Sequence, residues 1–83
     1  MNLKKVFGKN VRYYRFKKGY TQEKFAEYVN LNTTYVSELE HGKYGSTFEK
    51  VEKIAEVLEV EPFELFIERE NINILPDRVD MKC

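Results

Sequence analysis

The residues between Asn32 and Glu38 carry a closely spaced set of hydrogen-bonding side chains: an amide, several hydroxyls and a carboxylate. Such groups can bind the base edges that nucleic acid exposes in its grooves, and a threonine methyl can contact thymine. No arginine lies in this stretch to bind guanine through two hydrogen bonds, so discrimination would rest on apolar contacts, DNA shape and water. The candidate base-contacting residues are Asn32, Thr33, Thr34, Tyr35, Ser37 and Glu38.

Catalytic chemistry has little support in the same sequence. It contains no serine–histidine–aspartate arrangement, no cluster of cysteines and histidines, and no glycine-rich phosphate loop. His41 is the only histidine and Cys83 the only cysteine, so a histidine–cysteine metal cluster and an internal disulfide are both excluded. We therefore predict a protein that is not an enzyme and uses no metal or other cofactor.

Two short helices are predicted to position the candidate residues. Apolar residues recur at helical spacing on both sides of a turn at Asn30, which suits a left-handed helix exit. Thr21 can cap the first helix, and Asn32 or Thr33 can cap the second, which extends from about residue 32 to Glu40. Two crossed helices with a short turn and a polar outer face form a helix-turn-helix. The residues expected to face inward are Phe25, Ala26, Val29, Val36 and Leu39.

Further helices are expected on both sides of this pair. Apolar spacing predicts a helix from Leu3 to Lys18, closed by Gly19. A capping-box pattern from Ser46 to Glu49 opens another helix, and Pro62 stands at the start of a last one. The apolar stripe of the helix after Ser46 consists of Phe48, Val51, Ile54, Ala55 and Leu58.

The chain divides into a domain over residues 1–67 and a tail over residues 68–83. In the tail, Ile72 and Ile74 alternate with asparagines as in a short strand, and Pro76 ends the pattern. We expect either a dimerisation strand that pairs with its copy or a disordered segment. The apolar residues that we assign to a dimer interface are Phe63, Phe66, Ile67, Ile72 and Ile74.

The formal net charge of zero conceals an uneven distribution. Residues 1–22 hold seven basic side chains and no acidic one, whereas residues 46–83 hold ten acidic and five basic side chains. A basic first helix with an acidic rear surface restores the nucleic-acid interpretation that the net charge alone would disfavour. The other interpretation is a basic helix that is merely solvated.

The sequence from Val6 to Phe66 resembles the helix-turn-helix domain of the Cro/cI repressor family, also called the XRE family. The resemblance implies an all-α fold, namely a compact five-helix lambda-repressor-like domain with a short C-terminal extension. Asn30 stands where the family usually has glycine, and Ser46 where proline is common. The residues that carry the match are Thr21-Gln22-Glu23, Phe25-Ala26, Leu31, Tyr35-Val36-Ser37, Leu39-Glu40 and Gly42.

The resemblance also implies roles for single residues. Arg15 would pair with Glu40, and Gln22 would hold a phosphate together with the amino end of its helix. The alternatives are that Arg15 is a solvated base, that Gln22 is an ordinary helix former, and that Tyr35 shields the core rather than contacting DNA. The candidate phosphate contacts are Arg12, Gln22, Lys43 and Tyr44.

These features together predict a cytoplasmic, sequence-specific DNA-binding transcriptional regulator that binds a palindromic operator in double-stranded DNA as a homodimer. The Thr34-Tyr35-Val36-Ser37 run resembles controller proteins of restriction–modification systems. The alternative hypothesis is an antitoxin, which would bind operator DNA with the same helices and a toxin protein with its acidic rear surface or tail. No apolar run approaches the length of a membrane span, so no membrane partner is expected.

Overall fold

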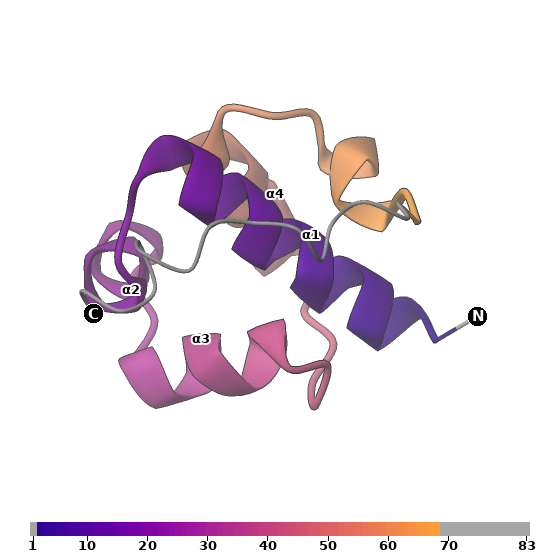
Figure 1. Cartoon of the computed structure of the whole chain (residues 1–83), viewed down its shortest axis with the longest axis horizontal. Coiled ribbons are helices and arrows are strands. Elements are labelled where there is room, and N and C mark those ends of the chain that lie inside the picture. The colour runs from indigo at the N-terminus through magenta and orange to yellow at the C-terminus, as the bar shows by residue number, and fades with distance from the viewer. Residues whose placement is uncertain (1, 69–83) are drawn as a thin grey trace.

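Four α-helices and one short 3-10 helix make up the computed structural model, which describes residues 2–68. Their bounds are α1 Leu3–Lys18, α2 Gln22–Val29, α3 Thr33–Glu40, α4 Phe48–Leu58 and the 3-10 helix η1 Pro62–Phe66. In Figure 1, α1 crosses the middle of the molecule, with α3 below it and α4 behind it. The described residues form no strand, and none of their helices is long and apolar enough to cross a membrane. The all-helical prediction is confirmed for this part of the chain.

The ends of the first three helices follow from single residues that the sequence had marked. The Thr21 hydroxyl accepts a hydrogen bond from the Lys24 amide, and the Asn32 side chain accepts one from the Tyr35 amide. Gly19 and Asn30 adopt the left-handed conformation, with φ of 77° and 62°. These caps satisfy amide and carbonyl groups that a helix end leaves unpaired, which explains why the helices begin and end where predicted.

The prediction of five helices is confirmed in part, since four are α-helices and the last element is a short 3-10 helix. Pro62 does begin a helical turn, and the Glu61 amide donates to the Glu64 carboxylate at 2.9 Å to complete a capping box. The turn is a 3-10 helix of five residues, however, because Ile67 returns to extended backbone with φ −90° and ψ 125°. A 3-10 helix has poorer hydrogen-bond geometry than an α-helix and seldom lengthens beyond such a turn.

The start of α4 also differs from the prediction. Thr47, not Ser46, caps the helix, and its hydroxyl accepts a hydrogen bond from the Lys50 amide at 3.2 Å. The third helical residue is therefore Lys50, which cannot complete a capping box as Glu49 would have done. Phe48 becomes the first helical residue, and its side chain is 86% exposed instead of lying in the core.

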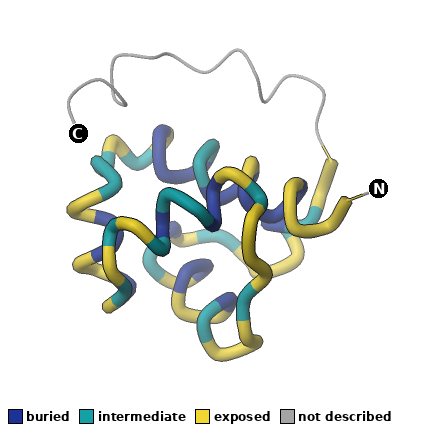
Figure 2. Tube along the Cα trace, turned by 90° about the horizontal axis from the view of Figure 1, so that it is seen from below, coloured by how far each residue is buried: buried dark blue, intermediate teal, exposed yellow. Residues whose placement is uncertain are grey.

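The core lies where α1, α2, α3, α4 and η1 meet, and buried residues line the inner side of each helix (Figure 2). The inward stripes of α2 and α3 are buried as predicted, and so is that of α4 apart from Phe48. Leu3 has the same helical spacing as the buried residues Val6, Phe7 and Val11 of α1 but is 53% exposed. The principal members of the core are Phe7, Val11, Phe25, Ala26, Val36, Leu39, Ile54, Leu58 and Leu65.

α1 and α3 approach closely because Gly8 has no side chain. A Cβ atom at Gly8 would lie 2.3 Å from the Leu39 carbonyl oxygen and 2.9 Å from that of Glu40. This contact lets the backbone of α1 rest on the last turn of α3. The position of the polar helix α3 is thus set by backbone contact as well as by the core.

Asn10 joins α1 to the other end of the domain. Its amide nitrogen lies 3.0 Å from the carbonyl oxygens of Val6 and Leu65 and 2.8 Å from that of Ile67, and its side chain is buried. The same residue therefore orders the chain where it leaves η1. The predicted tail strand with Ile72 and Ile74 lies outside the described residues.

Candidate nucleic-acid interface

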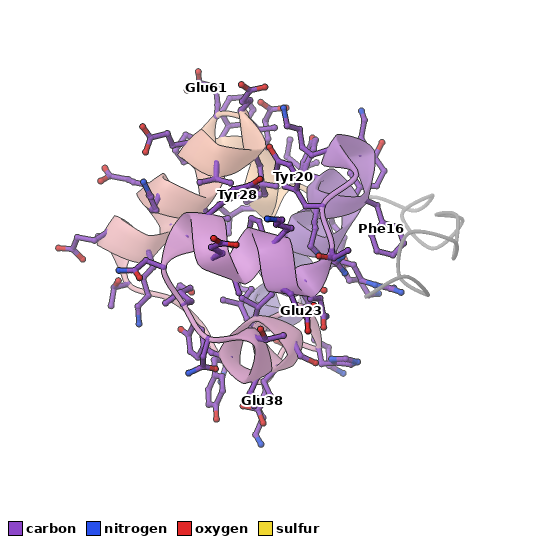
Figure 3. The ribbon with its side chains drawn as sticks, turned by 90° about the vertical axis from the view of Figure 1, so that its left-hand side faces the viewer. Phe16, Tyr20, Glu23, Tyr28, Glu38 and Glu61 are labelled. Atoms are coloured by element: carbon purple, nitrogen blue, oxygen red, sulfur yellow. The ribbon has the colours of Figure 1, made fainter. Side chains whose placement is uncertain are left out.

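The polar side of α3 lies opposite the stripe that enters the core. Val36, Leu39 and Glu40 are buried, and successive residues turn by about 100° around a helix axis. Thr34 and Glu38 therefore point most directly away from the core, and Figure 3 shows Glu38 projecting from the molecule on the side opposite Glu61. The surface that the sequence predicted as an interface is thus the polar outer side of one short helix. We call this side, centred on Thr34 and Glu38, the polar ridge.

Of the six candidate base-contacting residues, Thr34 and Glu38 lie on this ridge, Tyr35 and Ser37 lie on its two sides, and Asn32 and Thr33 lie at the amino end of the helix. Asn32 and Thr34 are exposed, whereas Thr33, Tyr35, Ser37 and Glu38 are partly buried. The Asn32 side-chain oxygen is engaged by the Tyr35 amide at 2.7 Å, so its carboxamide nitrogen is the group turned to other partners. The structure therefore distributes the predicted set over the outer side, the flanks and the amino end of one helix.

Tyr35 has a role that sequence reasoning did not assign. Its ring stacks on Tyr44 at 5.5 Å with an interplanar angle of 15°, and its hydroxyl donates to the Gly45 carbonyl at 3.3 Å. The ammonium of Lys50 lies 4.9 Å from the centre of the same ring, on the side of α4. Tyr35 thus braces the loop after α3 against both helices and holds Tyr44 beside the polar ridge.

Glu38 is the one acidic group on the outer side of α3. Its carboxylate lies 3.4 Å from the ammonium of Lys43, which extends from the loop after the helix. Both side chains reach solvent, so the pair contributes little to stability. Its consequence is electrostatic, because Lys43 offsets a negative charge that would otherwise repel a phosphate backbone.

A buried network fixes the end of α3. The guanidinium of Arg15 binds the Glu40 carboxylate through two hydrogen bonds, Nε to Oε2 at 2.7 Å and Nη2 to Oε1 at 3.0 Å. Arg15 Nη1 also donates to the Tyr20 carbonyl at 2.9 Å, and Gln22 Nε2 donates to Glu40 Oε1 at 3.1 Å. Both charged side chains are almost fully buried, at 0% and 1% exposure. The network joins α1, α2 and α3 directly behind the polar ridge.

The four candidate phosphate contacts occupy three places. Gln22 opens α2 and lies beside Glu40, as its hydrogen bond shows, whereas Lys43 and Tyr44 lie in the loop after α3. Arg12 lies on α1, where its guanidinium covers the ring of Phe16 at 4.9 Å from the ring centre. The amino end of α2 and the loop therefore flank the ridge, an arrangement in which donors lie on both sides of the base-contacting residues.

A groove of about 400 Å³ lies between the amino ends of α1 and α4 and η1. Phe7, Val51 and Phe66 form part of its wall, and the Phe66 ring stacks on Phe7 at 5.2 Å. Leu3 and Phe48, exposed at 53% and 86%, also line it, and η1 and the residue after it expose Phe63 at 65% and Ile67 at 39%.

Of the five predicted dimer residues, Phe66 lines this groove, Phe63 and Ile67 are exposed on η1 and just after it, and Ile72 and Ile74 lie outside the described residues. The exposure of Leu3 and Phe48 was not predicted, because both fit an inward apolar stripe. The signal that could have revealed Phe48 is Thr47, an equally good N-cap that moves the phenylalanine to the first, outward position.

Residues 2–68 bring together no group of histidine, cysteine, aspartate and glutamate side chains suited to a metal ion.

The acidic side chains of α4, Glu49, Glu52 and Glu56, are exposed. Glu59, just after the helix, binds Lys18 of α1. The hydrogen bond between them raises the pKa of Lys18 and lowers that of Glu59.

Comparison with known proteins places the same elements in a wider group. Residues 11–65 match the family model described as helix-turn-helix. The chain is 37% identical over 65 residues to the control protein C.BamHI of Bacillus amyloliquefaciens, an alignment that covers 77% of this chain and 80% of that protein.

Two crystal structures are similar to this chain in both fold and sequence. A hypothetical transcription factor from Neisseria superposes with a TM-score of 0.77 at 33% identity, over 81% of this chain and 75% of that one. The restriction–modification controller protein C.AhdI from Aeromonas hydrophila gives a TM-score of 0.71 at 35% identity, over 76% of this chain and 91% of that one.

Proposed function

The chain belongs to the helix-turn-helix family of the Cro/cI type, and we propose that it is a transcriptional regulator that binds a palindromic operator as a homodimer. The observation that carries the proposal is the polar ridge of α3, which projects from the domain between two groups of phosphate-binding candidates. A helix that presents its outer side in this way fits the major groove of B-DNA.

Base contacts come from the exposed, early part of α3 in this proposal. Thr34 offers a hydroxyl and a methyl group, and the Asn32 carboxamide can bind adenine or an adjacent phosphate. Because α3 contains no arginine or lysine, its base contacts carry little net charge. Charge neutralisation falls to residues outside the helix, and affinity should therefore depend on salt through Lys43 and the bases of α1.

The homodimer would form through the apolar groove and its surrounding side chains. A monomer would leave four apolar side chains of a small domain, those of Leu3, Phe48, Phe63 and Ile67, exposed to water. A two-fold interface would bury these side chains on both copies at once. Two copies related in this way would present two α3 helices to half-sites about 34 Å apart, one turn of DNA. The palindromic operator in the proposal follows from that symmetry.

The similarity to C.BamHI and C.AhdI supports a controller role within this function. In that role the protein would bind operator DNA and control the expression of a restriction–modification system. In a reporter assay with the upstream DNA of the gene, added protein should change expression, and the Thr34→Ala variant should change it less.

Selection of bound sequences from a random pool of DNA duplexes tests the function itself. The proposal predicts enrichment of an inverted repeat whose half-sites are about one helical turn apart. Enrichment of a single half-site would contradict the dimer, and salt-sensitive binding without any enriched sequence would contradict sequence-specific regulation.

The mass of the protein in solution tests the interface. Phe63→Asp should shift the sedimentation coefficient to that of a monomer, because a carboxylate at the centre of an apolar contact would remain buried and unpaired. Tyr28→Ser is the matched control, since Tyr28 is also an exposed aromatic residue but lies on α2 against Tyr20 (Figure 3). An unchanged mass for Phe63→Asp, or an equal shift for the control, would remove the groove from the interface.

A further inference from the structure

The outer side of α3 continues for one residue beyond the helix. His41 follows Thr34 by seven positions and Glu38 by three, so all three lie on one side of the helix axis. That side is opposite Val36, Leu39 and Glu40, which enter the core. His41 is exposed, and it is therefore the last member of the polar ridge.

A hydrogen bond fixes the orientation of the His41 ring. Its Nδ1 lies 2.7 Å from the carbonyl oxygen of Ser37, which also accepts the backbone amide of His41 at 3.2 Å. A carbonyl oxygen can only accept, so Nδ1 must carry the hydrogen. Nε2 is then the ring atom left for another partner: it accepts a hydrogen bond when the ring is neutral and donates one when the ring is protonated.

The charges around His41 come from every element that packs near the end of α3. Of the two acidic residues in α3, Glu38 is paired with Lys43 and Glu40 with Arg15. From α1, the stem of Lys5 would contact a Cβ atom at Gly42, the next residue in the chain. Helices α1, α2 and α4 carry further charged side chains, namely Lys4, Lys9, Arg12, Lys17 and Lys18 on α1, Glu23, Lys24 and Glu27 on α2, and Glu49, Lys50, Glu52, Lys53 and Glu56 on α4.

We propose that His41 is a DNA-contacting residue whose protonated ring donates from Nε2 to a phosphate oxygen, so that DNA affinity increases as the pH falls. The inference rests on the proposed function, because it places DNA against the ridge. A cation here is also favoured by the carboxyl end of α3, where the helix dipole is negative.

A phosphate is a better partner for His41 than a base edge. The residue lies beyond the last turn of α3, in the same loop as Lys43 and Tyr44, whereas base edges are reached from the early residues of such a helix. The imidazolium would also be the only cation on the polar ridge itself, since Thr34, Ser37 and Glu38 carry none. It would add one counterion-releasing contact that neutral His41 does not supply.

The test measures the affinity of the homodimer for its selected operator between pH 5.5 and 7.5 at constant salt. One charged hydrogen bond per protomer predicts that affinity weakens by about tenfold or more from the lowest to the highest pH, because only the protonated ring donates from Nε2. The His41→Gln variant keeps a hydrogen-bonding side chain that does not titrate, and its affinity should be nearly constant. Since the chain has one histidine, no other side chain of this type contributes.

The outcomes separate the two proposals. A flat profile for the parent protein, or an equal slope for His41→Gln, would overturn the role of His41 while operator binding stands. A pH effect that is present with the operator and absent with unrelated DNA would assign Nε2 to a base and refute the phosphate contact. If the selection yields no bound sequence at any pH between 5.5 and 7.5, both proposals are overturned. Circular dichroism of His41→Gln shows whether the variant is folded.

Discussion

Removing the charge of Arg15 should be the most damaging single change to this domain that leaves its apolar core intact. Arg15→Met keeps an unbranched apolar stem but removes the guanidinium, and with it both hydrogen bonds to Glu40 and the one to the Tyr20 carbonyl. The Glu40 carboxylate, 1% exposed, would lose its cation inside the protein. Breaking a buried pair in this way costs about 3–5 kcal/mol, more than the pair itself is worth.

The consequence for unfolding is large for a domain of this size. A domain of fewer than one hundred residues changes its Tm by about 4–8 °C per kcal/mol, so Arg15→Met should lower Tm by about 15 °C or more. Glu40→Gln should also destabilise, because it leaves the guanidinium buried without a charge partner. Thermal unfolding must be compared at one protein concentration, since dimerisation would otherwise shift Tm.

The double variant separates the pair from its parts. With both substitutions present, neither buried charge remains, and the loss should be smaller than the sum of the single losses by at least about 1–2 kcal/mol. Lys24→Met with Glu27→Gln is the control, because that pair is exposed and its atoms lie 3.7 Å apart; its coupling should be below about 0.5 kcal/mol. Additive losses at Arg15 and Glu40 would refute the argument that each stabilises the other in the core.

Three further predictions follow from local geometry. Gly8→Ala should lower the free energy of unfolding by about 1–3 kcal/mol in urea despite alanine's better helix propensity, because its Cβ would lie 2.3 Å from the Leu39 carbonyl oxygen; equal or greater stability would contradict the close crossing. Asn10→Ala should cost about 1–3 kcal/mol, because it leaves buried carbonyl groups without a donor, and an unchanged Tm would show that these bonds are replaced. The bond to Lys18 lowers the pKa of Glu59, so it stabilises the protein at pH values above the ordinary carboxyl pKa of 4.5 and is lost as the pH falls through the lowered pKa. The Tm difference between the parent and Lys18→Met should therefore shrink from pH 6 to pH 3. A constant difference would refute the pair.

Much of the fold could be predicted from the sequence because the residues at which its helices begin and end form hydrogen bonds with nearby residues. Gly19, Thr21, Asn30 and Asn32 each satisfy backbone groups within a few positions of themselves, so their effect is visible in the sequence. The same is true of the α3 ridge, whose sides are fixed by helical periodicity once Val36 and its neighbours are buried.

The remaining features depend on contacts between distant residues. Two adjacent N-cap candidates precede Phe48, and only packing decides that α4 begins after Thr47 and turns the ring outward. The stacking of Tyr35 on Tyr44 requires the loop to fold back on α3, which periodicity does not describe. The close approach at Gly8 likewise needs the carbonyl groups of another helix.

The measurement that tests the central claim most directly is the ratio of affinities for the selected operator and for a scrambled duplex, compared between the parent protein and the Thr33→Ala/Thr34→Ala variant. Thr34 lies on the ridge and Thr33 opens α3, so the variant should lose most of its preference while it still binds both duplexes in a salt-dependent manner. An unchanged ratio, with a folded variant, would mean that another surface reads the DNA sequence and would contradict the assignment of α3 as the recognition helix.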